Sequence, residues 1–165
     1  TILSSIKFDI IAILSGPEPH RSEFERILKE QLSNFNKKSL IIRGITNTNT
    51  EESTINNLTL IDHLPASSIQ SLLNEDPVVI CRGGYSTLMD LSFTGNKVIC
   101  VPTPGQTEQE YLAKKGSSEN RLVYCNQKYF SLNDCLSKVK STTGITKANT
   151  VGYHIAVAML IAKFR

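Results

Sequence analysis

Short apolar runs alternate with turns and amphipathic segments along most of the chain, and this alternation constrains the fold more than any other feature. The run from Phe8 to Leu14 is rich in β-branched residues and ends in the turn Ser15–Pro19. In the segment that follows, the apolar residues recur at three- and four-residue spacing. The first pattern is typical of a strand buried on both faces, and the second of a helix that packs on a sheet. Repeated units of this kind predict an α/β fold with a doubly wound parallel sheet and right-handed crossovers.

The remaining elements are predicted from the same patterns. We expect strands at 8–14, 40–43, 58–61, 78–80, 98–101 and 121–124, with helices over about 20–36, 65–74, 131–140 and 148–164 and after the turns near residues 84 and 106. The stretch from Gly44 to Asn57 is rich in Thr and Asn without periodicity, so we expect a surface loop there. No linker divides the chain, and residues 1–165 are predicted to form a single domain.

Composition excludes several classes of protein. A chain of 165 residues with 40% hydrophobic residues can bury a substantial core, and a scattered net charge of +3 argues against nucleic acid as a partner. No apolar run approaches the roughly 20 residues of a membrane span. The four cysteines form no C-x-x-C pair, which favours buried, reduced thiols of a cytosolic protein over a metal or disulfide role.

Two polar clusters follow neighbouring predicted strands, at residues 81–90 and 102–110. Parallel strands present their carboxyl ends at one edge of the sheet, where ligands bind in open α/β folds. The pair Gly83-Gly84 allows the backbone to approach a phosphate, and the helix behind it would direct free N–H groups and its positive dipole end at the same place. An anionic ligand is therefore expected at this edge.

Each cluster also has a purely structural interpretation. Thr87 with Asp90 and Thr107 with Glu110 have the spacing of capping boxes, which would only complete a helix start. Alternatively, Asp90 could accept hydrogen bonds from ribose hydroxyls, and the dense amide and carboxylate side chains after residue 105 would suit a polyhydroxylated ring. Gly16 lies in a loop that is neither a G-x-G-x-x-G fingerprint nor a P-loop, so it is either a tight turn or an amide near a phosphate.

The histidines do not indicate a metal or a catalytic motif. None has a partner at metal-ligand spacing, and neither a G-x-S-x-G elbow nor an H-E-x-x-H helix is present. His20 and His154 are expected to be structural, whereas His63 follows a predicted strand and opens on the same edge as the two polar clusters.

The stretch Cys81-Arg82-Gly83-Gly84 and the later Gln109-Glu110-Tyr111 resemble the donor-binding C-terminal half of GT-B glycosyltransferases of family 28. The best-known member of this family transfers N-acetylglucosamine from its UDP carrier. The resemblance covers most of the chain and is strongest between Ile61 and Ala113. It implies a Rossmann-like domain that forms the C-terminal half of a GT-B architecture.

The resemblance also implies roles for individual residues. Asp90 would hold the ribose hydroxyls, and the amides of Ser86 and Thr87 would receive the α-phosphate. Gln109 and Glu110 occupy the positions where the family has a Gln-Gln pair that contacts the donor sugar. Because an ionised carboxylate cannot donate a hydrogen bond, Glu110 leaves the identity of the sugar open. The full predicted donor site is Gly16, Arg82, Gly83, Gly84, Tyr85, Ser86, Thr87, Asp90, Gln106, Glu108, Gln109 and Glu110, with Ile61, His63 and Leu64 at the uracil edge.

The resemblance implies the donor half of an inverting, metal-independent enzyme that transfers a hexose or N-acetylhexosamine from a UDP-sugar. No catalytic residue, metal or cofactor is expected in this chain, since the acceptor site and the usual catalytic base belong to the N-terminal domain. The chain does not begin with Met, so we expect a fragment that is inactive by itself and needs its own N-terminal domain or a separate acceptor subunit. We expect a cytoplasmic protein that reaches the inner face of the membrane only through that acceptor half.

Two alternatives to this function remain open at the sequence level. One is a nucleotide-sugar 2-epimerase domain, which shares the two-domain architecture. The other is a non-catalytic, stand-alone donor subunit that recruits a membrane-bound acceptor subunit.

Overall fold

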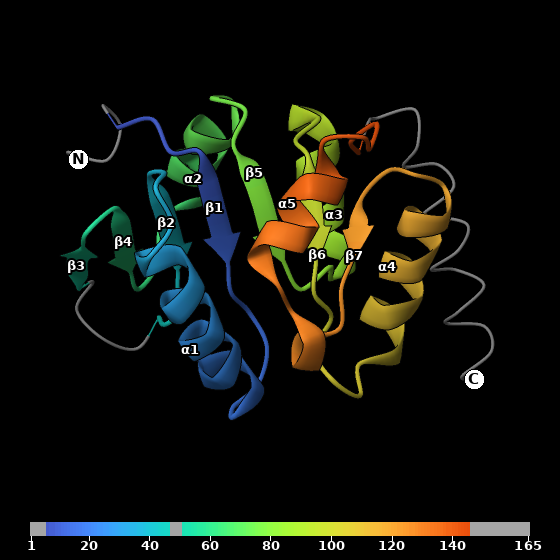
Figure 1. Cartoon of the computed structure of the whole chain (residues 1–165), viewed down its shortest axis with the longest axis horizontal. Helices are drawn as coiled ribbons and strands as arrows, with labels where there is room; N and C mark the ends of the chain where they lie inside the picture. The colour runs from blue at the N-terminus through green and yellow to red at the C-terminus, as the bar shows by residue number, and fades with distance from the viewer. Residues whose placement is uncertain (1–5, 47–50, 146–165) are drawn as a thin grey trace.

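A single mixed sheet forms the centre of the molecule, as the computed structural model shows for residues 6–46 and 51–145 (Figure 1). The strands run in the order β3-β4-β2-β1-β5-β6-β7. Their bounds are β1 Ile10–Ile13, β2 Ser39–Ile42, β3 Glu52–Ile55, β4 Leu58–Ile61, β5 Val78–Cys81, β6 Val98–Cys100 and β7 Val123–Tyr124. All neighbouring pairs are parallel except β3 with β4. The predicted Rossmann-like α/β domain is confirmed.

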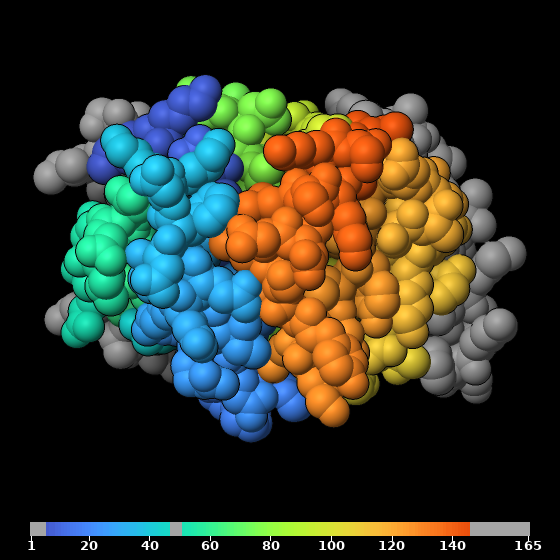
Figure 2. All heavy atoms as spheres, in the orientation of Figure 1, coloured from blue at the N-terminus to red at the C-terminus, as the bar shows by residue number. Residues whose placement is uncertain are grey.

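Helices cover both faces of this sheet. Their bounds are α1 His20–Ser33, α2 Ala66–Leu73, α3 Tyr85–Thr94, α4 Thr107–Ser118 and α5 Leu132–Val139, with a 3-10 turn η2 at Gln127–Tyr129. The apolar sides of α1 and α5 share one core with the sheet, and those of α2, α3 and α4 pack on the opposite face. Figure 2 shows α1 in blue and α5 in orange side by side over the first of these faces. The sheet is therefore buried on both sides, as its continuous apolar strands predict.

The strand order locates the ligand-binding edge. The six parallel strands follow the order 3-2-1-4-5-6 in the sequence, so the direction of winding reverses between β1 and β5. In open α/β sheets ligands bind at the carboxyl ends of the strands beside this switch point. The register pairs Ile13 with both Ile42 and Cys81, so the loops after β1, β2 and β5 leave the sheet at one level.

The segment from Gly44 to Asn57 was predicted as a loop, and this prediction is wrong for β3. Residues Glu52–Ile55 pair antiparallel with β4 through a turn in which Asn56 has a φ of 54°. Every residue of β3 is exposed, and an edge strand that buries no face carries no hydrophobic alternation from which it could be recognised. The predicted helix at 148–164 lies outside the described residues.

Element boundaries differ from the predictions by one to three residues. Pro65 precedes α2 rather than opening it, and β7 begins at Val123 rather than Arg121. Cys81, Cys100 and Cys135 are buried free thiols as expected, whereas Cys125 is only half-buried. Among the described helices, none has both the length and the hydropathy that crossing a membrane requires.

Candidate functional site

The loops after β1 and β6 meet at the carboxyl edge of the sheet. Gly16 in the first loop has a φ of 103°, and a Cβ atom there would lie 3.3 Å from the Thr103 hydroxyl oxygen of the second. Thr103 is buried, and its hydroxyl has no hydrogen-bond partner among the described residues. Glycine at position 16 thus permits a close approach of these loops beside the switch point.

The turn Gly83-Gly84 connects β5 to α3. Gly83 has a φ of 76°, and a Cβ atom there would lie 2.1 Å from Cys100 Sγ on β6, so only glycine fits. A Cβ atom on Gly84 would meet nothing within 4 Å, and this residue is the N-cap of α3. The turn therefore lies tightly against β6 at its first residue and is open at its second.

The start of α3 presents backbone donors at this opening. The first bond within the helix runs from the Leu88 amide to the Gly84 carbonyl, so the amides of Ser86 and Thr87 have no acceptor inside α3. Free amides at the positive end of a helix dipole attract an anion. The predicted phosphate-binding atoms thus lie together on one turn beside the switch point.

The capping-box interpretation of Asp90 is wrong. The N-cap of α3 is Gly84, three residues before Thr87, and no side chain caps the helix. Asp90 lies in the second turn and is exposed to solvent. Its carboxylate is therefore not needed to complete the helix start.

The start of α4 carries the residues that were predicted to contact a sugar. The N-cap is Gln106 and again makes no side-chain cap bond, so the Thr107–Glu110 capping box is wrong as well. Gln109 Oε1 accepts a hydrogen bond of 2.9 Å from the Thr103 amide, and Glu110 lies 3.6 Å from Lys114 Nζ. Gln106 and Glu108 are exposed. Gln109 thus fixes the loop after β6, with its amide nitrogen left for other contacts.

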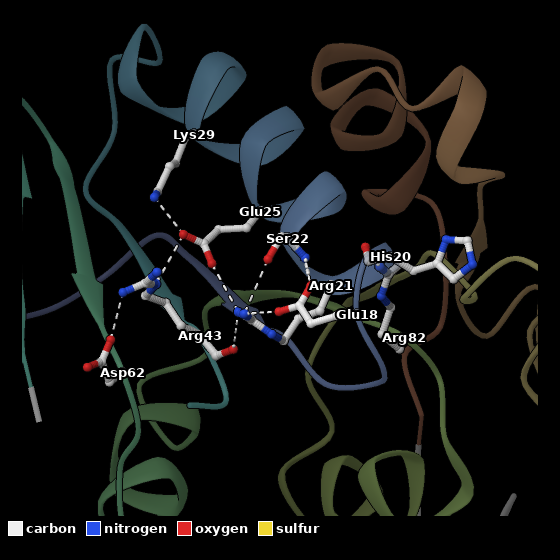
Figure 3. Close-up of polar contacts among 9 residues, drawn as sticks. All are labelled: Glu18, His20, Arg21, Ser22, Glu25, Lys29, Arg43, Asp62 and Arg82. Carbon is white, nitrogen blue, oxygen red and sulfur yellow. Dashed lines mark hydrogen bonds and ion pairs between the residues drawn. The ribbon is translucent and has the colours of Figure 1, made fainter. Parts of the chain in front are cut away.

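Arg82 was predicted to bind the donor, but its side chain is buried in the protein with only 1% exposed. Its Nη1 donates to Gln127 Oε1 at 2.6 Å and to the Val101 carbonyl at 3.3 Å. Its Nη2 donates to the His20 carbonyl at 2.6 Å (Figure 3). The guanidinium also lies 4.4 Å from the Phe24 ring centre. Burial lowers the Arg82 pKa to about 10, so the group stays protonated at neutral pH. The side chain joins α1, β6 and η2 behind the glycine turn and does not face the opening.

A second network, partly buried, was not predicted from the sequence. Arg43, directly after β2, donates to Glu25 Oε1 at 3.0 Å and to Asp62 Oδ1 at 2.8 Å (Figure 3). Arg21 donates to Glu25 Oε2 at 3.1 Å and to the Arg43 carbonyl at 3.2 Å, and it also pairs with Glu18. These contacts tie α1 to the ends of β2 and β4.

The cations of this network affect the pKa of the Glu25 carboxyl. Burial by itself would raise the pKa of the Glu25 carboxyl, but hydrogen bonds from Lys29 and Arg43 lower it below its usual value. The four-residue spacing of Arg21, Glu25 and Lys29 is a readable helix signal, whereas the contacts of Arg43 depend on the strand order.

The predicted uracil edge lies farther along the sheet. Ile61 is buried at the end of β4, and His63 and Leu64 are half-buried in the loop that follows. In the strand order β2 and β1 separate β4 from β5, which corresponds to roughly 14 Å at the usual strand spacing. The loop leads into α2, which packs beside α3 on the same face of the sheet. His63 and the glycine turn therefore border the same edge of the sheet.

The comparison with known proteins concerns a domain with these features at its edge: the glycine turn, the free start of α3 and the loop after β6. A model of the glycosyltransferase family 28 C-terminal domain matches residues 21–147. The chain belongs to this family. It is a glycosyltransferase donor-binding domain, and its match includes both polar clusters at the carboxyl edge.

Solved structures agree with this family 28 assignment at the level of the fold. ALG13, studied in solution by NMR, has a TM-score of 0.60 at 9% identity over 84% of this chain and 89% of that chain. MurG from Acinetobacter baumannii has a TM-score of 0.58 at 14% identity over 84% and 44% of the two chains, and SnogD from Streptomyces nogalater one of 0.55 at 13% identity over 93% and 43%. The chain thus spans less than half of the last two proteins. No curated protein matches this chain by sequence.

The residues 6–46 and 51–145 hold no group of three or more His, Cys, Asp or Glu side chains placed to bind a metal ion.

Proposed function

We propose that this domain binds the UDP-sugar donor of an inverting transferase that moves a hexose or N-acetylhexosamine without a metal ion. The single observation that carries the proposal is the open start of α3 at the switch point of a family 28 domain. A diphosphate placed there would accept hydrogen bonds from the amides of Ser86 and Thr87. The same contacts would stabilise the charge that develops on the UDP leaving group.

The surrounding residues support binding of the whole donor. Asp90, one turn farther along α3, is free to accept bonds from the ribose hydroxyls, since the helix start does not use it. Gln106, Glu108, Gln109 and Glu110 at the start of α4 are proposed to contact the sugar. Transfer would also require an acceptor site and a catalytic base, which we assign to an N-terminal domain or a separate acceptor subunit.

The experiment is isothermal titration calorimetry of the chain with UDP, UDP-N-acetylglucosamine, UDP-glucose and GDP-mannose in the presence of EDTA. We expect UDP and at least one UDP-sugar to bind, with GDP-mannose weaker. A strict requirement for Mg²⁺ or Mn²⁺ would contradict metal independence, and absence of UDP binding under every condition would contradict the donor assignment.

A matched pair of variants tests the amides directly. Ser86→Pro removes one N–H group at the second position of α3, where proline is tolerated because this group has no acceptor in the helix. We expect UDP affinity to fall at least tenfold. Asn133→Pro makes the same change at the second position of α5 and should leave UDP affinity unchanged. Equal affinity in both variants would contradict phosphate binding at α3.

A second candidate is a stand-alone donor subunit that recruits a membrane-bound acceptor subunit. The observation in its favour is that the likeness to ALG13 extends over 89% of that chain, whereas it extends over less than half of MurG. Sugar transfer by the separately expressed chain, with no other protein added, would contradict it. The 2-epimerase alternative predicts that the chain alters a UDP-sugar in the absence of any acceptor.

A further inference from the structure

The four cysteines form two neighbouring pairs with different surroundings. Cys81 and Cys100 are register partners on β5 and β6 and are 1% and 0% exposed. Cys125 follows β7, while Cys135 lies in α5, and their thiols are hydrogen-bonded to each other. Both residues of the second pair pack in the core beneath α1 and α5.

The second pair differs from the first in its access to solvent. Cys125 is half-buried, with Cys135 behind it at 3% exposed. A small oxidant can therefore reach the outer thiol of this pair, whereas the sheet and its helices enclose both Cys81 and Cys100. The arrangement of one accessible sulfur in contact with one sheltered sulfur is that of an attacking and a resolving thiol.

The groups around Cys125 favour its thiolate. A hydrogen bond from the Cys135 thiol lowers the Cys125 pKa to about 7, assisted by the Ser131 amide and the Lys138 charge and opposed by burial and by Asp134. The protonated Cys125 thiol can donate to the carbonyl oxygens of Asn126 and Tyr129, 3.5 and 3.8 Å from its sulfur, which opposes the thiolate. The pKa of Cys135 is raised by the same hydrogen bond, so the negative charge resides on the accessible sulfur.

We propose that Cys125 and Cys135 are a modification site at which a hydroperoxide forms an intrachain disulfide. The Cys125 thiolate attacks one oxygen of hydrogen peroxide, the O–O bond breaks, and the departing hydroxide takes up a proton to become water. The Cys135 sulfur then attacks the resulting sulfenic acid at Cys125. The S–O bond breaks, and the departing hydroxide leaves as water with the Cys135 proton. Two thiols and one peroxide thus give one disulfide and two waters.

The disulfide would close the segment from residue 125 to residue 135 at its base. This segment contains η2, whose Gln127 accepts the bond from Arg82, and Phe130, whose ring packs edge-on against Phe24 at 5.4 Å. Both anchors hold the segment in place in the reduced protein. The two thiols, which interact in the reduced protein, therefore lie close together before oxidation.

The test treats the folded chain with hydrogen peroxide, blocks the remaining thiols with an alkylating reagent and analyses a tryptic digest by mass spectrometry. Cleavage after Arg121, Lys128 and Lys138 places Cys125 and Cys135 on the separate peptides 122–128 and 129–138. We expect these two peptides joined by a disulfide, with loss of two hydrogens. Cys81 and Cys100 fall on two other peptides, 44–82 and 98–114, and should be recovered alkylated.

Two serine variants separate the roles of the thiols. Cys135→Ser should stop the reaction at a Cys125 sulfenic acid, which dimedone traps, and Cys125→Ser should leave Cys135 alkylatable at the same peroxide dose. Circular dichroism confirms that each variant is folded. Oxidation of all four cysteines at similar rates, a disulfide between chains, or no linkage of peptides 122–128 and 129–138 would overturn the proposal.

Discussion

At Arg82 a guanidinium that directly precedes the proposed phosphate-binding turn makes its contacts inside the protein. Its Nη atoms donate to His20, Val101 and Gln127, so these hydrogen bonds are not available to a ligand. From the sequence, Arg82 was placed in the donor site because the Cys81–Gly84 stretch resembles the family's motif. The burial that decides the matter depends on Gln127 and Phe24, which lie far away in the sequence.

Also at the scale of the residue, Asp90→Asn should weaken UDP binding by about 1 to 3 kcal/mol if the carboxylate accepts charge-assisted bonds from ribose. The melting temperature should stay nearly constant, since Asp90 does not cap α3. Calorimetry and thermal unfolding of one variant measure both quantities. Asp134→Asn, at an exposed acid of α5, is the control and should leave UDP affinity unchanged. A lower melting temperature with unchanged affinity would indicate a structural role for Asp90.

Glu110→Gln should change the preference among UDP-sugars and leave the affinity for UDP nearly unchanged. A site that hydrogen-bonds a specific hydroxyl discriminates strongly when its donor and acceptor roles are exchanged. The variant also loses the ion pair with Lys114, so Lys114→Met serves as the control for that contact alone. Competition binding with the UDP-sugars measures the preference. Equal losses for UDP and every UDP-sugar would instead indicate that Glu110 supports the helix start.

At the scale of the element, the β5–α3 turn is fitted to its neighbour β6. Gly83→Ala would combine a φ of 76° with a Cβ atom 2.1 Å from Cys100 Sγ. Gly95→Ala has nearly the same backbone strain, at a φ of 75°, but meets nothing within 4 Å. We expect Gly95→Ala to cost about 1 to 2 kcal/mol and Gly83→Ala roughly 1 to 3 kcal/mol more.

Urea unfolding of both variants measures this difference. Cys100→Ala removes the sulfur that the new methyl group would meet, so the double variant Gly83→Ala/Cys100→Ala should be less destabilised than the sum of its single changes. Similar stabilities of Gly83→Ala and Gly95→Ala would show that β6 moves away from the turn at little cost.

The network that ties α1 to β2 and β4 gives a prediction about acid. The Glu25 pKa is lowered from its ordinary 4.5 in the folded protein, so its contribution to stability is complete above pH 4.5 and is lost as the pH falls through the folded value. Glu25→Gln should therefore lower stability at pH 7 and flatten its decline between about pH 5 and 3. Glu30→Gln, at an exposed carboxylate of the same helix, should change neither. Melting temperatures across this range test both variants, and parallel curves for wild type and Glu25→Gln would contradict the prediction.

At the scale of the whole molecule, the alternation of buried runs and amphipathic segments was enough to predict the parallel sheet, since each unit carries its own period. The strand β3 was not predicted because all its residues are exposed, so it has no alternation of buried and exposed residues to recognise. The two capping boxes were misplaced because α3 begins two residues earlier than Thr87 and α4 begins after Gln106. The segments around Gly83 and Gln109 are local in sequence, and their position at the carboxyl edge of the sheet was predicted correctly. The contacts of Arg82, Arg43 and Asp62 depend on strand order and were not.

The hydrogen bond between Arg82 and Gln127 bears on how the chain folds while it is synthesised on the ribosome. These residues are 45 positions apart, and the guanidinium stays incompletely paired until the later one has emerged. Strands β1, β2 and β5 are all synthesised before that moment, so much of the sheet can pair while the glycine turn still lacks its backing. The glycine turn thus receives its backing from Arg82 only after the strands of the sheet have been synthesised.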